Sequence, residues 1–240
     1  MLNQHKPLTQ QVVVICGATS SVGVATARMA AKQGAKLVLA ANDQAALDAL
    51  SSDIRHHGGE LLSLPVKPSV KDEVWALGRA AVQHFGVIDT WVNVAADAHP
   101  DAKIEPCDER QFATDFRATV HGTTVARELM ALHGGAIVNF DSDASAIHDV
   151  QRFTESLRSE IDSDGVPISV TLLHALDAGG KNTAQLVAEA ILYAAVHEQR
   201  DIHVGRVPRV TARQPNPAVN LLARCVDMLM LRHPQNTWRF

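Results

Sequence analysis

The chain has 240 residues, of which 46% are hydrophobic, and its formal net charge is −4, so one packed globular domain is expected. No long run of Lys and Arg is present, which argues against nucleic acid as the main partner. Three widely separated cysteines and twelve scattered histidines form no CxxC or HExxH motif, so we expect no metal site. The sequence shows neither an apolar leader nor roughly 18 consecutive apolar residues, which predicts a cytoplasmic protein without a membrane span.

The predicted elements alternate between short β-branched runs and longer segments of helical periodicity. Residues 12–16 are wholly apolar and predict a buried parallel strand. A turn rich in Gly and Ser follows, and an alanine-rich helix then runs to about residue 33, closed by Gly34. Further strands are predicted at 36–40, 61–64, 90–94, 136–140, 168–173 and 202–205, and further helices at 43–57, 70–85, 109–133, 148–163 and 183–197.

This alternation predicts an α/β fold, a single doubly wound, Rossmann-type domain over residues 1–210 with a parallel sheet of about seven strands. Ligands of such folds bind at the carboxyl ends of the strands, where the strand order reverses. Residues 211–240 differ in character and carry an amphipathic helix at about 217–231. That tail packs on the same domain or forms an oligomer interface; contact with a membrane surface is a further alternative.

A turn of small residues joins the first strand to the first helix. Backbone N–H groups of such a turn can approach a pyrophosphate, and the helix N-terminus favours the anion. The alternative is a tight turn that holds no ligand. The residues of this turn that are candidates for phosphate binding are Gly17, Thr19, Ser20, Ser21, Val22 and Gly23.

Four segments carry a resemblance to a known family. VVVICGATSSVGVATARMAAKQGAKLVLAAND resembles the opening of the short-chain dehydrogenase/reductase (SDR) family, whose turn has the pattern TGxxxGxG, and TWVNVAADA is similar to its WVNNAG stretch. FTESLRSEIDSDGVPISVTLL and VAEAILYAAVHEQRDIHVG follow in the family's order. The resemblance implies an NAD(P)-binding oxidoreductase fold whose subunits pair through residues 183–205.

The cofactor positions depart from the family pattern. Ser21 replaces the middle glycine of the turn, and Asn42 stands where NADP-preferring members have an arginine. Lys67 replaces an aspartate that contacts adenine in the family. Asn93 and Ala95 remain from the NNAG stretch. NAD and NADP are therefore both possible cofactors, and a chain that binds neither is the alternative.

The catalytic positions depart further. Asp115 matches the family's active-site asparagine and Ser142 its serine, but the tyrosine and lysine slots of YxxxK fall on Asp143 and Ile147. The only tyrosine of the chain is Tyr193, and no lysine lies between residues 103 and 181. The long loop that covers the substrate in the family is almost deleted after the sixth strand. Loss of a catalytic acid typically lowers a rate on the order of 10²–10⁴-fold.

These departures predict a divergent SDR-like protein without standard dehydrogenase activity. It would act by binding, by regulation, or by assembly as a homo-oligomer or with a catalytic SDR-like partner. One alternative is an NAD(P)-dependent oxidoreductase with a rebuilt active site. A second alternative is a cofactor-free acid–base enzyme that uses Asp143 and His148.

Overall fold

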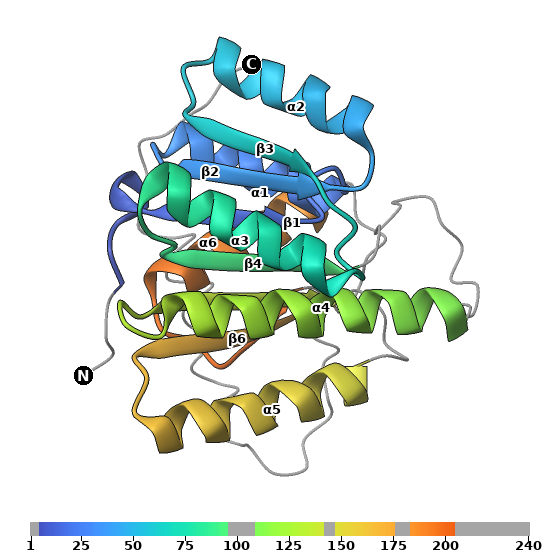
Figure 1. Cartoon of the computed structure of the whole chain (residues 1–240), viewed down its shortest axis with the longest axis vertical. Coiled ribbons are helices and arrows are strands. Elements are labelled where there is room, and N and C mark those ends of the chain that lie inside the picture. Colours follow the sequence, from blue (N-terminus) through green and yellow to red (C-terminus); the bar gives the residue numbers. More distant parts are fainter. Residues whose placement is uncertain (1–4, 96–108, 142–146, 176–182, 205–240) are drawn as a thin grey trace, which may run out of the picture. The chain divides into compact units, whose positions relative to one another are not determined.

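The computed structural model describes residues 5–95, 109–141, 147–175 and 183–204, and its core is one parallel sheet (Figure 1). The strands pair in the order β3-β2-β1-β4-β5-β6-β7, and every pair is parallel. This confirms the predicted doubly wound α/β fold with seven strands. Their bounds are β1 (Val12–Cys16), β2 (Lys36–Ala41), β3 (Leu61–Pro65), β4 (Thr90–Ala95), β5 (Gly135–Asp141), β6 (Ile168–Ala175) and β7 (Asp201–Val204).

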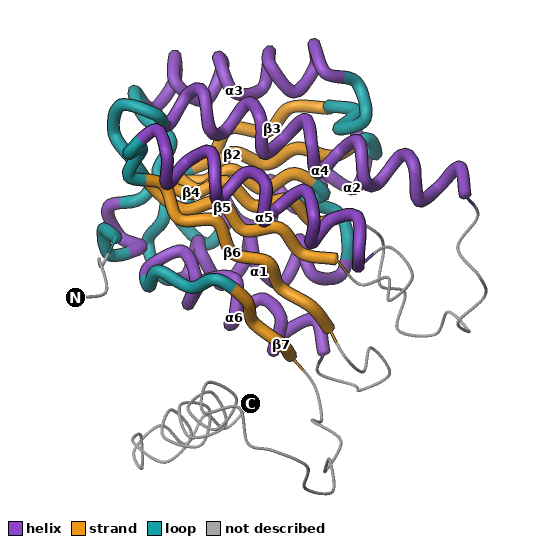
Figure 2. The backbone as a smooth tube through the Cα atoms, turned by 90° about the horizontal axis from the view of Figure 1, so that it is seen from below, coloured by secondary structure: helices purple, strands orange, loops and turns teal. Residues whose placement is uncertain are grey.

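Helices cover both faces of the sheet (Figures 1 and 2). Apolar side chains of α1, α2 and α6 form one buried cluster with the sheet, and those of α3, α4 and α5 form the other. Parallel strands buried on both faces have continuous apolar sequences, and all five residues of β1 are buried. The helices are α1 (Ser21–Lys32), α2 (Gln44–His56), α3 (Lys71–Phe85), α4 (Glu109–Met130), α5 (Ile147–Asp164) and α6 (Thr183–Val196).

The strand order reverses between β1 and β4. From β1 the chain moves outward through β2 and β3, then crosses back to β4 and continues outward in the other direction to β7. The crossovers diverge at this point, which leaves a crevice at the carboxyl ends of the two central strands. These carboxyl ends, which we call the carboxyl edge, lie to the right in Figure 1.

The predicted boundaries agree with the structure to within about two residues for most elements, the usual uncertainty of helix and strand ends. The prediction for α4 was too long, because residues 131–133 form a turn in which the N–H of Gly134 donates to the Met130 carbonyl. The prediction for β6 was too short, because pairing with both neighbours continues to His174, opposite Asp141 and His203.

The opposite end of the sheet, the amino edge, is closed by residues that precede β1. A short 3₁₀ helix, η1 (Leu8–Gln10), was not predicted. The Gln11 side chain donates to the carbonyls of Lys6 and Ala195, and it accepts a hydrogen bond from the Thr90 hydroxyl. Asp89 accepts from the Val12 N–H at 2.8 Å and from the Lys6 ammonium at 2.7 Å. This network fixes β1 to β4 and to the end of α6.

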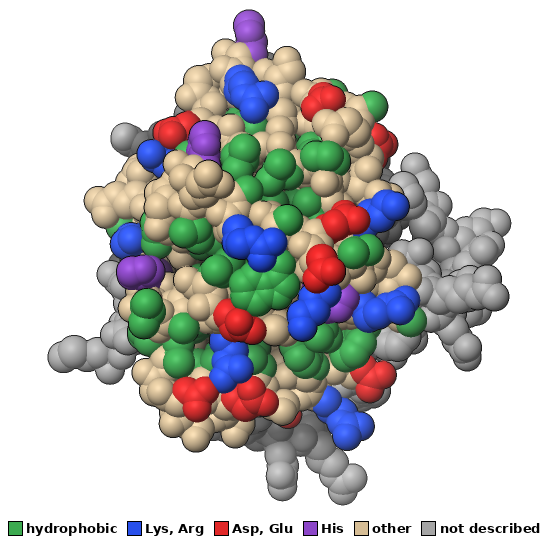
Figure 3. Space-filling view, in the orientation of Figure 1, with side chains coloured by type: hydrophobic (Ala, Val, Ile, Leu, Met, Phe, Trp, Pro, Cys, Tyr) green, Lys and Arg blue, Asp and Glu red, His purple; other side chains and the backbone are tan. Residues whose placement is uncertain are grey.

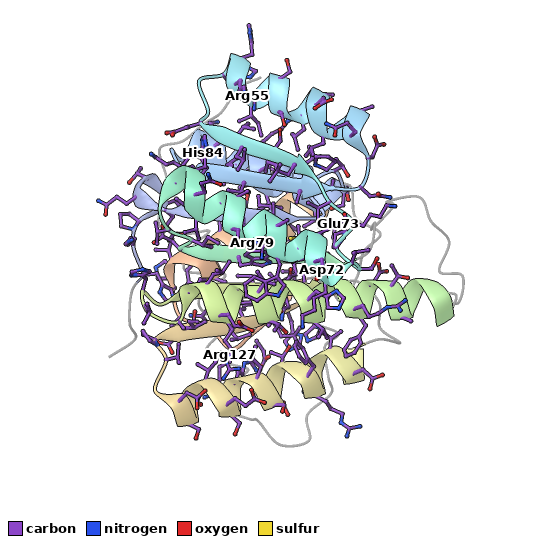
Figure 4. The ribbon with its side chains drawn as sticks, in the orientation of Figure 1. Arg55, Asp72, Glu73, Arg79, His84 and Arg127 are labelled. Carbon is purple, nitrogen blue, oxygen red and sulfur yellow. The ribbon has the colours of Figure 1, made fainter. Side chains whose placement is uncertain are left out.

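The face built by α3, α4 and α5 carries acidic and basic side chains side by side, with apolar side chains among them (Figure 3). Arg127 on α4, for example, pairs with Glu160 and Asp164 on α5 (Figure 4). Within the described ranges, no helix is both long and apolar enough to cross a bilayer. The helix predicted at about 217–231 and the domain boundary at residue 210 lie outside the described residues.

Candidate functional site

A cavity of about 320 Å³ opens at the carboxyl edge, at the point where the strand order reverses. Side chains from the ends of β1 and β4, from the loops after β2 and β3, and from α4 surround it. Its lining residues are Cys16, Asn42, Lys67, Pro68, Ser69, Asn93, Val94, Thr114, Asp115, Ala118 and Thr119. The cavity therefore lies where ligands of doubly wound folds bind.

Two glycines shape the turn between β1 and α1. Gly17 has φ of +84°, and a Cβ atom there would collide with the carbonyl oxygen of Val94 on β4. A Cβ atom on Gly23 would overlap the backbone of Gly17 and Ala18. Glycine is therefore required at both positions, one for its backbone conformation and both for close approach.

The turn is closed by hydrogen bonds of its own. The Ser20 hydroxyl donates to the Gly17 carbonyl at 2.8 Å and accepts the Gly23 N–H at 3.0 Å, so Ser20 is the N-cap of α1. The N–H groups of Gly17 and Ala18 both donate to the Ala40 carbonyl on β2. The first turn of α1 thus begins in a fixed orientation beside the cavity, where its N–H groups and dipole favour an anion.

Sequence reasoning predicted residues in four separate segments that this fold brings together. Asn42, Lys67, Asn93 and Asp115 all line the cavity. Thr19, Ser20, Ser21 and Val22 do not line it, but their turn continues directly from Cys16, which does. The side chain of Ala95, at the end of β4, lies outside the described residues.

Asn93 has a role that the sequence did not reveal. Its side-chain nitrogen donates to Thr123 at 3.1 Å and to Asn139 at 2.9 Å, and its oxygen accepts the indole N–H of Trp91. A Cβ atom at Gly122 on α4 would overlap that oxygen, so α4 packs directly on the amide. The Asn93 side chain thus holds β4 to β5 and α4 where it lines the cavity.

Further lining residues were missed by the sequence analysis. Thr114 and Ala118 are one helical turn apart on α4, and so are Asp115 and Thr119. Once Asp115 was singled out, this i, i+4 spacing would have predicted its neighbours on the same face. Cys16 was also missed as a lining residue; burial raises the pKa of its thiol to about 12, so it stays protonated and is no nucleophile.

The loop after β3 places Lys67 at the cavity. The Val70 N–H donates to the Lys67 carbonyl, and the Lys67 N–H donates to the Glu73 carboxylate at 2.7 Å. Glu73 lies in the first turn of α3, beside this loop (Figure 4). The backbone of Lys67 is therefore fixed, while its side chain is exposed at the cavity.

The structure describes only some of the residues that the sequence analysis predicted to be catalytic. Ser142 and Asp143 lie outside the described residues, and only the backbone of His148 is described, in the first turn of α5. Tyr193 lies near the end of α6, where its ring stacks on His197 at 4.2 Å between centroids. The carbonyl of Val196, the last residue of α6, accepts the N–H of His5, which precedes β1, and the chain then continues to the start of β7. Tyr193 therefore lies at the amino edge.

His174 is a buried titratable side chain at the carboxyl end of β6. It is 4% exposed, its ring stacks on His203 at 5.3 Å, and its Nδ1 has no hydrogen-bond partner among the described residues. Burial lowers the pKa of His174, and the neighbouring imidazole of His203 lowers it further. His174 is therefore a neutral imidazole at the carboxyl edge at neutral pH.

Comparison with known proteins shows which family this chain resembles. The chain matches the short chain dehydrogenase family over residues 11–184. An uncharacterized oxidoreductase of Bacillus subtilis, YxnA, is 32% identical over 272 residues, which cover 98% of this chain and 76% of the relative. A cis-4-hydroxycyclohexanecarboxylate dehydrogenase of Sinomonas cyclohexanicum is 30% identical over 143 residues, which cover 58% of this chain and 57% of the relative.

Solved structures share the fold. A short-chain dehydrogenase/reductase from Burkholderia phymatum in complex with NAD aligns with a TM-score of 0.69 and 21% identity, over 98% of this chain and all of that one. A metagenomic short-chain oxidoreductase in complex with NADP gives the same TM-score at 20% identity, over 86% of this chain and all of that one. Because the family match spans residues 11–184 of 240, the chain belongs to the short-chain dehydrogenase family.

Proposed function

We propose that this chain is a dinucleotide-binding member of its family that does not reduce carbonyl groups by the family's tyrosine–lysine mechanism. It acts instead by binding, regulation or assembly, as a homo-oligomer or with a catalytic relative. A nicotinamide dinucleotide fits the residues present: α1 begins at a turn of small residues, where the helix N-terminus favours an anion such as a pyrophosphate, and the adjoining cavity is open beside the ends of β1 and β2. When bound, that cofactor would supply a hydride.

One observation supports the proposal that the family's carbonyl reduction is lost in this chain. A carbonyl that accepts a hydride needs a proton donor close to the developing alkoxide, and the family uses a tyrosine for this. The only tyrosine of this chain, Tyr193, stacks on His197 at the amino edge, whereas the cavity lies at the carboxyl edge. The whole length of the sheet separates the two.

The length of the chain supports the same proposal. The match to the Bacillus subtilis relative extends over 272 aligned positions, whereas this chain has 240 residues. At least 32 positions of the alignment therefore have no counterpart in this chain. Deletions of that size agree with the short stretches that follow β5 and β6, where the family has its tyrosine and its substrate loop.

The test is an assay of cofactor oxidation with purified protein, NADH or NADPH, and a panel of aldehydes and ketones. We expect turnover at least about 10²-fold below that of a family member with intact tyrosine and lysine. We also expect the Ser142→Ala variant to have the same residual rate as the unchanged protein. Turnover at the level of the intact relative, or a residual rate that Ser142→Ala abolishes, would overturn the proposal.

His174 favours a second candidate, an oxidoreductase with a rebuilt proton donor. Its Nδ1, which has no hydrogen-bond partner in the part of the chain that the structure describes, lies at the carboxyl edge, on the strand next to the one that leads into Ser142. The names of the relatives also favour oxidoreductase activity. In that case a His174→Phe variant would lose turnover while retaining its affinity for the cofactor, and the rate would depend on a group with a pKa below that of ordinary histidine.

A further inference from the structure

The charges around the cavity favour one kind of dinucleotide. Among the described residues that line it, Lys67 carries the only positive charge and Asp115 the only negative charge. No described carboxylate lies within ion-pair distance of the Lys67 ammonium; Glu73, in the first turn of α3, accepts the Lys67 backbone N–H instead. The ammonium is therefore free to bind an anionic group that enters the cavity.

The end of β2 lacks the partner that an unphosphorylated adenosine ribose needs. In doubly wound folds this ribose lies at the end of the second strand, where a carboxylate accepts hydrogen bonds from its hydroxyl groups. Here the strand ends in Ala40 and Ala41, which are buried and carry no polar side chain. The next acid, Asp43, lies beyond the strand and caps α2, where one of its carboxylate oxygens accepts the Ala46 N–H at 3.0 Å.

Asn42 and Lys67 line the same cavity from neighbouring strands, because β2 and β3 are paired and their ends meet. Asn42 offers a neutral amide, and Lys67 offers three N–H donors and a full charge. The N-terminus of α2, which begins two residues after Asn42, adds a partial positive charge. These groups suit a phosphate better than a pair of ribose hydroxyls.

We propose that the cavity selects NADP(H) over NAD(H), and that Lys67 is the specificity-determining residue, through its contact with the 2′-phosphate. This inference rests on the proposed dinucleotide binding. Lys67 stands where the family has an aspartate that contacts adenine, and its longer, positively charged side chain would take the part that an arginine after β2 plays in NADP-binding folds. One charge-assisted contact to phosphate corresponds to about tenfold in affinity.

The test is a set of dissociation constants for NADPH and NADH, measured from cofactor fluorescence, for the unchanged chain and three variants. The unchanged protein should bind NADPH about tenfold more tightly than NADH. Lys67→Ala should remove that preference by weakening NADPH alone, and Lys67→Arg should retain it. Lys71→Ala is the matched control: it removes a lysine four residues later, outside the cavity lining, and should change neither constant.

The outcomes separate this inference from the function on which it rests. NADH binding as tight as NADPH binding would overturn the NADP(H) selection and leave dinucleotide binding intact. Equal weakening of both cofactors in Lys67→Ala, with unchanged thermal stability of the free protein, would mean that Lys67 does not discriminate and would also overturn the inference. Binding of neither cofactor at millimolar concentration would overturn both. A preference for NADPH in the unchanged protein that shrinks with added salt would support it.

Discussion

The two edges of the sheet use polar residues in different ways. At the amino edge, Gln11, Asp89 and Thr90 are buried, and their side chains are paired with one another or with backbone groups. At the carboxyl edge, an exposed Lys67 lines an open cavity, and the buried His174 has a ring nitrogen with no partner within the described ranges. Polar residues that satisfy each other stabilise the fold, whereas those left open are available to a ligand.

This difference has a physical origin in the parallel sheet. Each helix that follows a strand begins at the carboxyl edge, so first-turn N–H groups and positive dipole ends collect there. The C-termini of the helices and the loops that return to the strands lie at the amino edge, where residues before β1 bind them through hydrogen bonds. Substitutions at the two edges should therefore have separable effects on stability and on binding, and three predictions test this.

The largest effect is expected at Gly17. Gly17→Ala should destabilise the fold by about 3 kcal/mol or more, because alanine is strained at positive φ and its Cβ would collide with Val94. Gly58→Ala is the matched control: its φ is +83°, but nothing lies within 4 Å of an added Cβ, so only about 1–2 kcal/mol should be lost. Urea denaturation measures both variants. Equal losses would mean that the turn tolerates movement away from β4.

A smaller effect is expected at the amino edge. Asp89→Ala removes the acceptor of the buried Val12 N–H and should cost about 2 kcal/mol. Lys6→Ala breaks the ion pair to Asp89 from its half-exposed side and should cost less than about 1 kcal/mol. Denaturation curves measure both losses, and the NADPH dissociation constant of the folded variants should not change. Weaker cofactor binding in Asp89→Ala would contradict the separation of the two edges.

The smallest effect concerns pH. The pKa of His174 is lowered in the folded protein, so below the ordinary value of 6.5 the unfolded chain binds more protons than the folded one. Stability is therefore complete above that value and falls as the pH drops towards the folded pKa. His5, whose pKa burial also lowers, acts in the same direction.

In His174→Phe, which keeps an aromatic ring but no titratable group, the loss of stability on acidification should be smaller than in the unchanged protein. Denaturation midpoints across this pH range measure the difference. An identical pH dependence in the variant, or stability that increases on acidification, would contradict the prediction.

Much of the fold was predictable because this chain marks its elements clearly. Apolar runs such as residues 12–16 are typical of strands buried on both faces, and glycines at positive φ, such as Gly34 and Gly86, end the helices. The doubly wound parallel sheet followed from the alternation of strands and helices and from the handedness of crossovers. What was missed were boundaries fixed by tertiary pairing, such as the extension of β6 to Ala175.

The site was predictable only in part. Asn42, Lys67 and Asp115 were predicted because each lies next to the end of a strand or at a matched motif position. The use of Asn93 as an anchor between β4, β5 and α4 was not predictable, since it depends on three-dimensional neighbours such as Thr123. The burial of His174 likewise depends on packing that no spacing rule reports. The predictions for Ser142, Asp143 and His148 remain predictions.

The most direct test of the central claim, that the phosphate-binding half of the crevice still works, is a thermal-shift titration of the purified chain with NADPH. At a concentration about 100 times the dissociation constant, binding stabilises a folded protein by roughly 2.7 kcal/mol, which for this size raises the melting temperature by several degrees. We predict such a rise, and we predict that it is lost in Gly17→Ala at temperatures where that variant is folded. No rise at millimolar NADPH or NADH would contradict the claim.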